Sequence, residues 1–169
     1  LLPELIALSA QRDPQAVALT YGKHSLGYGE LQEAVARCAA GLIDLGLQRG
    51  ERVAIYLEKR FETVIASFGA PAAGGVFVPL NPLLKPEQVA YILRDCNVRV
   101  LVTSPERLSL LAPVLAACHD LRRVVVLDSQ QPLPTDGGLS YGRWSDLLAA
   151  PRRAGHRVID TDMVAILYT

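Results

Sequence analysis

Apolar residues recur at two different spacings along the first third of the chain, and each spacing predicts a different element. Helical spacing marks residues 2–11 and residues 31–45, the second being a long amphipathic helix that ends near Gly46. The apolar stripe of the first helix consists of Leu2, Leu5, Ile6 and Leu8. Between the two helices, residues 16–21 alternate as a strand does, and Gly22-Lys23-His24 predicts the turn of a short hairpin.

From residue 52 onward, short and continuously apolar runs alternate with helical patterns. The runs predict strands at residues 52–57, 76–80, 98–103, 123–127 and 163–168, and the helical patterns fall at residues 61–74, 86–95 and 105–118. Such strands are typical of a parallel sheet that is covered on both faces. The predicted fold class is α/β: a mostly parallel sheet with helices on both faces, preceded by an N-terminal helix and a short β-hairpin. Residues 129–155 are predicted to be a loop-rich connection with one short helix near residues 144–150.

Charge and composition narrow the classes of function. The 169 residues contain 17 Lys and Arg against 17 Asp and Glu, so the formal net charge is zero and nothing indicates a nucleic-acid partner. The three cysteines, Cys38, Cys96 and Cys118, form no metal-binding or disulfide pattern, and we interpret them as reduced, mostly buried thiols of a cytoplasmic protein. The histidines are scattered too, which favours surface or loop positions over a metal site.

One stretch raises the question of a membrane span. Residues 63–84 carry no charged side chain, which approaches the ~20 residues that a transmembrane helix needs. Gly69, Pro71 and Gly74 interrupt it, so a helix that leads into a buried strand explains it better, and we expect no integral membrane segment. Glu4 and Arg12 interrupt the first apolar run, so we also expect no signal peptide.

The predicted order of elements ends on a strand. Ligands of parallel α/β sheets bind just beyond the carboxyl ends of the strands. A sequence that stops there stops where a binding loop is expected, so we interpret residues 1–169 as a truncated portion of a larger domain.

Four segments, in order, resemble the adenylate-forming family of acyl-CoA synthetases, peptide-synthetase adenylation domains and luciferases. They are Leu26-Gly27-Tyr28-Gly29-Glu30-Leu31, Gly50-Glu51-Arg52-Val53-Ala54-Ile55-Tyr56-Leu57, Ala73-Gly74-Gly75-Val76-Phe77-Val78-Pro79-Leu80-Asn81-Pro82 and Asp162-Met163-Val164-Ala165-Ile166-Leu167-Tyr168-Thr169. The resemblance implies the N-terminal portion of the large AMP-binding domain. In the family the last segment leads into a glycine-rich loop that wraps the phosphates of ATP, so Thr169 is the predicted first residue of that loop.

The resemblance also implies the chemistry of the whole protein. A small carboxylic acid would react with ATP, assisted by Mg²⁺, to give an acyl-adenylate, and the thiol of CoA or of a carrier protein would then displace AMP. The family's catalytic residues lie downstream, so residues 1–169 are expected to contain none and to be inactive alone. Residues 78–88 resemble the acyl-CoA synthetase branch, and residues 81–95 resemble acyl-CoA ligases associated with bacterial exosortase systems.

Two residues depart from the family pattern. Gly27 replaces a Ser or Thr that would cap the long helix with Glu30 as capping-box partner, and glycine is a tolerable cap. Pro71 interrupts a predicted helix, which it is expected to kink or to shorten.

Two alternatives in function remain open. One is a fragment of a peptide-synthetase-type adenylation domain that loads a carrier protein. The other is a free-standing, non-enzymatic α/β binding module. The apolar residues 163–168 have no following helix to cover them, so we expect the fragment to self-associate, whereas a compact monomer would require this strand to pair inside the sheet.

Overall fold

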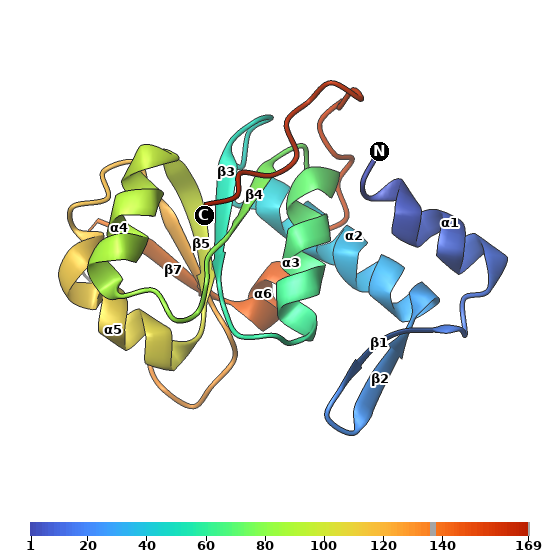
Figure 1. The fold of residues 1–169 in the computed structure, drawn as a ribbon, viewed down its shortest axis with the longest axis horizontal. Helices are drawn as coiled ribbons and strands as arrows, with labels where there is room; N and C mark the ends of the chain where they lie inside the picture. The colour runs from blue at the N-terminus through green and yellow to red at the C-terminus, as the bar shows by residue number, and fades with distance from the viewer. Residues whose placement is uncertain (136–137, 169) are drawn as a thin grey trace.

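A parallel sheet of five strands forms the centre of the protein (Figure 1). The computed structural model describes residues 1–135 and 138–168. The strand order is β4-β3-β5-β6-β7, and each neighbouring pair is parallel. Their bounds are Arg52–Tyr56 (β3), Val76–Pro79 (β4), Val98–Thr103 (β5), Arg123–Val126 (β6) and Ser140–Arg143 (β7). The predicted α/β class with a parallel sheet is confirmed.

Helices cover both faces of this sheet, as the apolar strands predict. On one face lie α2 (Tyr28–Asp44), α3 (Phe61–Ala72) and α6 (Trp144–Ala149), and on the other lie α4 (Pro86–Asp95) and α5 (Pro105–Leu115) (Figure 1). Within β3, Val53 and Ile55 point into the core between the sheet and α2, α3 and α6. Ala54 and Tyr56 point into the core between the sheet and α4 and α5. Alternate side chains of one strand thus enter two separate cores, which is why the strand has no polar face. In the described residues, no helix is long and apolar enough to cross a membrane.

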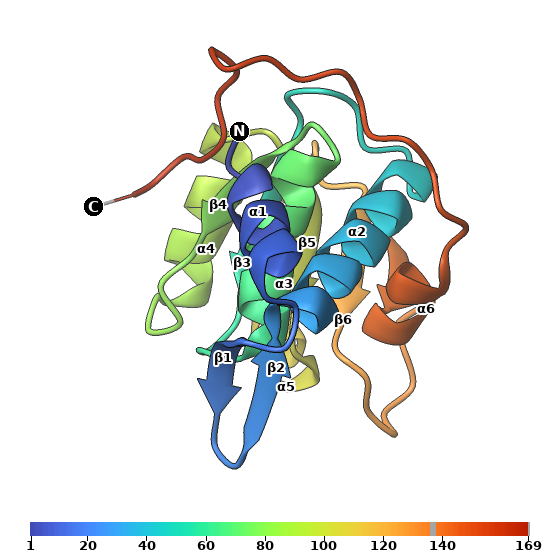
Figure 2. The ribbon, with the colours of Figure 1, turned by 90° about the vertical axis from the view of Figure 1, so that its right-hand side faces the viewer.

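The N-terminal segment forms the expected helix and hairpin beside this unit. Helix α1 (Glu4–Arg12) packs against α2, and β1 (Val17–Tyr21) pairs antiparallel with β2 (His24–Gly27) (Figure 2). The predicted apolar stripe of α1 is wrong in part, since Leu5 and Leu8 are 59% and 55% exposed. Ile6 and Ala10, one turn apart, are the residues that α1 buries.

Gly27 is the N-cap residue of α2, as predicted. Its backbone N–H donates to the Glu30 carboxylate at 2.9 Å, the half of a capping box that needs no side chain at the cap. A Cβ atom on Gly27 would lie 2.9 Å from the carbonyl oxygen of Pro14. The close approach of Pro14 therefore explains why glycine replaces the hydroxyl residue of the family pattern.

Helix α3 continues through Pro71 and ends at Ala72, two residues before the predicted end. Pro71 lies in the last turn, where it removes one helical hydrogen bond but has only Ala72 of the helix after it. The chain then turns at Gly74 (φ +88°), and the N–H of Gly75 donates to the carbonyl of Ala70 at 2.8 Å. This closure is a Schellman motif.

Two predictions from the pattern need correction. Residues 129–155 are not only a loop with a helix: they contain the strand β7, whose half-buried residues Ser140–Arg143 form no apolar run because they lie at the sheet edge. The predicted strand at residues 163–168 is also wrong. Only Ala165 forms a bridge, parallel to Phe77 of β4, and the chain on either side diverges from regular pairing.

Candidate functional site

The last residues of the described chain lie along the outer side of β4, the edge strand of the sheet (Figure 2). We call residues 156–168 the C-terminal strap. The N–H of Phe77 donates to the carbonyl of Val164 at 3.0 Å, and the N–H of Ile166 donates to the carbonyl of Phe77 at 3.1 Å. The strap runs parallel to β4, so its final residues leave the sheet toward the carboxyl end of that strand.

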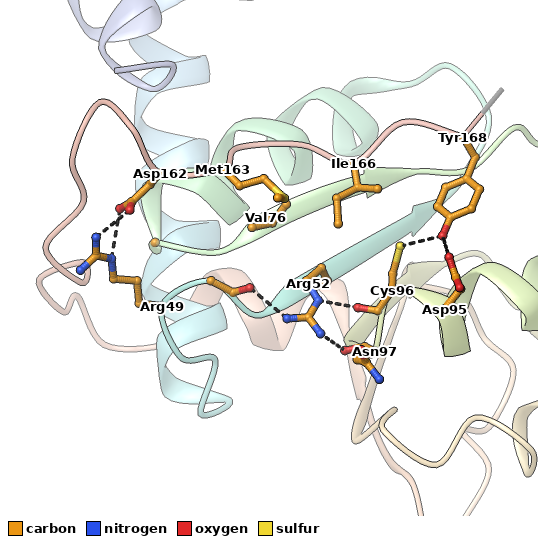
Figure 3. Close-up of a pocket in the computed structure, with 12 residues that line it drawn as sticks. Arg49, Arg52, Val76, Asp95, Cys96, Asn97, Asp162, Met163, Ile166 and Tyr168 are labelled. Carbon is orange, nitrogen blue, oxygen red and sulfur yellow. Dashed lines mark hydrogen bonds and ion pairs between the residues drawn. The ribbon is translucent and has the colours of Figure 1, made fainter.

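An ion pair holds the strap before it reaches β4. The guanidinium of Arg49 donates two hydrogen bonds to the carboxylate of Asp162, at 3.0 Å from Nε and 2.6 Å from Nη2 (Figure 3). The same carboxylate accepts from the N–H of Ile159 at 3.1 Å. The hydrogen bonds from Arg49, followed by that from Ile159, lower the pKa of Asp162. A bidentate Arg–carboxylate pair fixes orientation as well as distance, so this contact sets where the strap starts to run along β4.

A second contact precedes the ion pair. His156 Nε2 lies 2.8 Å from the carbonyl oxygen of Leu47, and its Cβ packs over Gly74. A Cβ atom on Gly74 would lie 2.8 Å from the Cβ of His156, closer than carbon atoms approach without repulsion. Gly74 is therefore needed twice, for its positive φ and for the passage of the strap above it.

The far end of the strap is held by Tyr168. Its hydroxyl donates to the carboxylate of Asp95 and accepts from the thiol of Cys96 at 3.4 Å (Figure 3). The hydrogen bond to Asp95, and next the contact with Cys96, raise the pKa of the Tyr168 hydroxyl. Asp95 is the last residue of α4, so this contact ties the strap to the helix that follows β4.

Residues of the strap line three cavities in the described part of the chain, and two of these reach Tyr168. The larger, of about 640 Å³, lies toward the amino ends of β3 and β4 and contains Arg49 and Arg52. Both guanidiniums are already engaged, Arg49 with Asp162 and Arg52 with the carbonyls of Cys96 and Asn97 (Figure 3). Both arginines that line this cavity therefore already have partners, and neither is left unpaired for a ligand.

The second cavity, of about 470 Å³, lies at the carboxyl end of β4. Its walls include Pro79, Leu80, Asn81, Leu84, Tyr91 and Tyr168. Parallel sheets bind ligands beyond the carboxyl ends of their strands, and the strap delivers the chain to this end. We take this end of β4, together with residue 168, as the candidate functional site.

The residue that the sequence predicts at this site, Thr169, lies outside the described residues. It directly follows Tyr168, so the anchored end of the strap is the part of the site that the structure describes. The tie between Tyr168 and Asp95 spans 73 positions, and that between Arg49 and Asp162 spans 113. No local pattern predicts pairs so far apart.

The cysteines are buried, as the sequence predicts. All three cysteines are free and buried, and burial raises the pKa of Cys38 to about 12. No three His, Cys, Asp or Glu side chains within the described residues gather where they could hold a metal ion.

Comparison with known proteins assigns a family to nearly the whole chain. The family described as AMP-binding enzymes matches residues 6–169. A long-chain-fatty-acid–CoA ligase of Thermus thermophilus is 32% identical over 135 residues, which cover 78% of this chain and 24% of that protein. Tyrocidine synthase 3 of Brevibacillus parabrevis is 32% identical over 145 residues, covering 83% of this chain and 2% of that protein.

Solved structures resemble the fold closely. The anthranilate CoA ligase AuaEII, in complex with anthranoyl-AMP, superimposes with a TM-score of 0.84 at 25% identity, over 97% of this chain and 31% of that one. MbtA of Mycobacterium smegmatis superimposes with a TM-score of 0.83 at 26% identity, over 99% of this chain and 31% of that one. The chain thus spans less than a third of the length of these four proteins.

Proposed function

The chain belongs to the family of AMP-binding enzymes, and from this premise we propose that it forms part of an ATP-dependent ligase that activates a carboxylic acid. A carboxylate oxygen attacks the α-phosphorus of ATP, the bond to the β-phosphate oxygen breaks, and pyrophosphate leaves. A thiol then attacks the carbonyl carbon of the acyl-adenylate, and AMP leaves. The observation that carries the proposal is the family match over residues 6–169, which includes the strap and Thr169.

In this proposal residues 1–169 are the leading portion of the AMP-binding domain, and their role is to hold the start of the phosphate loop. The strap brings Tyr168, the residue before Thr169 in the sequence, toward the carboxyl end of β4. We propose that the backbone N–H groups and small hydroxyls of a glycine-rich loop that follows Tyr168 approach the phosphates closely. Mg²⁺ would enter with the phosphates of ATP, because Mg²⁺ at such sites is bound largely by substrate oxygens.

We favour CoA as the thiol acceptor over a carrier protein. Asn81 follows β4 where peptide-synthetase adenylation domains more often have Asp, and two of the relatives above are CoA ligases. A carrier protein is the second candidate, since tyrocidine synthase 3 is also a relative at 32% identity. A cytoplasmic location is part of the proposal and fits the three free, buried cysteines.

The test is exchange of labelled pyrophosphate into ATP, in the presence of a panel of fatty and aryl acids. Residues 1–169 alone are expected to show no exchange above a no-enzyme control, whereas the natural protein at its full length should show exchange that depends on one class of acid. Adding CoA or a pantetheinylated carrier protein then identifies the acceptor from the thioester formed. Exchange by residues 1–169 alone, or none by the full-length protein with any acid, would contradict the proposal.

A further inference from the structure

The last backbone hydrogen bond between the strap and β4 does not by itself fix the direction in which the chain leaves the sheet. That bond is the one from the N–H of Ile166 to Phe77. The next side chain, Leu167, is 70% exposed and holds nothing in place, and Tyr168 then turns back to Asp95 and Cys96 (Figure 3). The tie of Tyr168 to α4 thus supplies the second fixed point that a direction requires.

The acceptor of this hydrogen bond stands where a carboxylate is otherwise unfavourable. Asp95 is the last residue of α4, and a negative charge at a helix C-terminus opposes the helix dipole. Its carboxylate makes a charge-assisted hydrogen bond, which is shorter and stronger than one between neutral groups. A residue that local helix electrostatics disfavour, and that contacts the strap beside the candidate site, suggests a role outside the helix.

We propose that Asp95 is a positioning residue for the phosphate loop: by holding Tyr168 it fixes the point and direction in which the described strap ends, directly before that loop. The inference rests on the proposed function, because it takes Thr169 as the first residue of the loop that binds the phosphates. A loop held at its first residue loses less conformational entropy when it closes on a ligand. Without the tie, the loop would start from a mobile residue and ATP binding would carry that cost.

Three variants isolate the contact. Asp95→Leu removes the acceptor, Tyr168→Phe removes the donor, and Asp95→Asn keeps an acceptor oxygen and should rescue. Asp120→Leu is the matched control, because Asp120 is a partly exposed carboxylate that accepts hydrogen bonds from Asn97 and Arg99 rather than from the strap.

The first measurement is hydrogen exchange of residues 159–168 in the natural full-length protein. Asp95→Leu and Tyr168→Phe should each speed exchange about tenfold, the change expected for the loss of one charge-assisted hydrogen bond. Their combination should add nothing further, and Asp120→Leu should leave the strap unchanged. Wild-type exchange in Asp95→Leu would overturn the inference.

The second measurement separates positioning from general destabilisation. In pyrophosphate exchange, Asp95→Leu should raise KM for ATP about tenfold while KM for the carboxylate stays at the wild-type value, and Asp95→Asn should restore both. Equal changes in the two KM values, or no change, would overturn the role of Asp95 and leave the proposed function intact. A wild-type protein without exchange activity would instead overturn the proposed function, and with it this role.

Discussion

Replacing Gly74 by alanine should release the C-terminal strap, and Gly46 provides a matched control. Both glycines end a helix in a Schellman motif: Gly46 at φ +90° after α2, and Gly74 at φ +88° after α3. In both motifs the next N–H donates to the carbonyl five residues earlier, Leu47 to Leu42 and Gly75 to Ala70. The two sites therefore impose the same backbone strain on alanine.

Their surroundings differ. A Cβ atom on Gly46 would meet no atom within 4 Å, whereas one on Gly74 would lie 2.8 Å from the Cβ of His156. The left-handed conformation costs a residue with a Cβ about 1–2 kcal/mol, so both variants should lose that much stability. Carbon atoms pack at about 3.5–4.0 Å, so His156 must also move by about 1 Å in Gly74→Ala. The strap, tied to β4 by two backbone hydrogen bonds, should yield before the core does.

Urea unfolding gives the global loss, and hydrogen exchange of residues 156–168 reports on the strap. We expect similar losses of about 1–2 kcal/mol in both variants, with faster strap exchange only in Gly74→Ala. The double variant Gly74→Ala/His156→Gly removes the overlap and should recover slow exchange at residues 162–168. Equal strap exchange in Gly46→Ala and Gly74→Ala would refute the reasoning, since strain alone would then account for both.

Three further predictions follow from other contacts. The hydrogen bonds from Arg49 lower the pKa of Asp162, so the stability that this carboxylate gives the strap is present above pH ~4 and is lost as pH falls through the folded pKa. The hydrogen-exchange rates of the strap, corrected for intrinsic exchange, should therefore rise as the pH falls from 5 to 2 in the wild type. In Arg49→Gln this rise should be absent. Gly27→Ser should destabilise by about 1 kcal/mol, because overlap with the Pro14 carbonyl outweighs a cap gain of a few tenths, and urea unfolding that shows a more stable variant would disprove it. Residues 1–169 in isolation should self-associate through the exposed apolar side chains of the strap, and light scattering that finds an 18.3 kDa monomer at the highest concentration would contradict this.

The sequence predicts the central elements well because their signals are local and redundant. The run Arg52–Tyr56 is apolar on both faces, and α2 carries both its apolar stripe and the glycine that ends it. β7 escapes prediction because Ser140–Arg143 contains neither signal: its strand form comes from pairing with β6. For residues 163–168 the prediction is wrong for the opposite reason: their apolar pattern predicts a strand, but only one bridge forms.

The candidate site, too, can be predicted from the sequence only in part. A binding loop after residue 168 is predicted from the order of elements and from the resemblance at residues 162–169, whereas the position of the strap beside β4 comes from the structure. The contacts that hold it, Arg49 with Asp162 and Asp95 with Tyr168, depend on the three-dimensional path of the strap. Polar residues so far apart have no distinguishing pattern in the sequence, so only the structure reveals their pairing.

Transfer of an isotope from the carboxylate to AMP tests the central claim most directly. If a carboxylate oxygen attacks the α-phosphorus of ATP, an acid labelled with ¹⁸O in its carboxyl group should give AMP that carries one labelled oxygen once the thioester has formed. The natural full-length protein, incubated with ATP, the labelled acid and CoA, should therefore release labelled AMP and unlabelled pyrophosphate, as read by mass spectrometry. Thioester formation with unlabelled AMP, or with ADP and labelled phosphate as products, would contradict an adenylate-forming role.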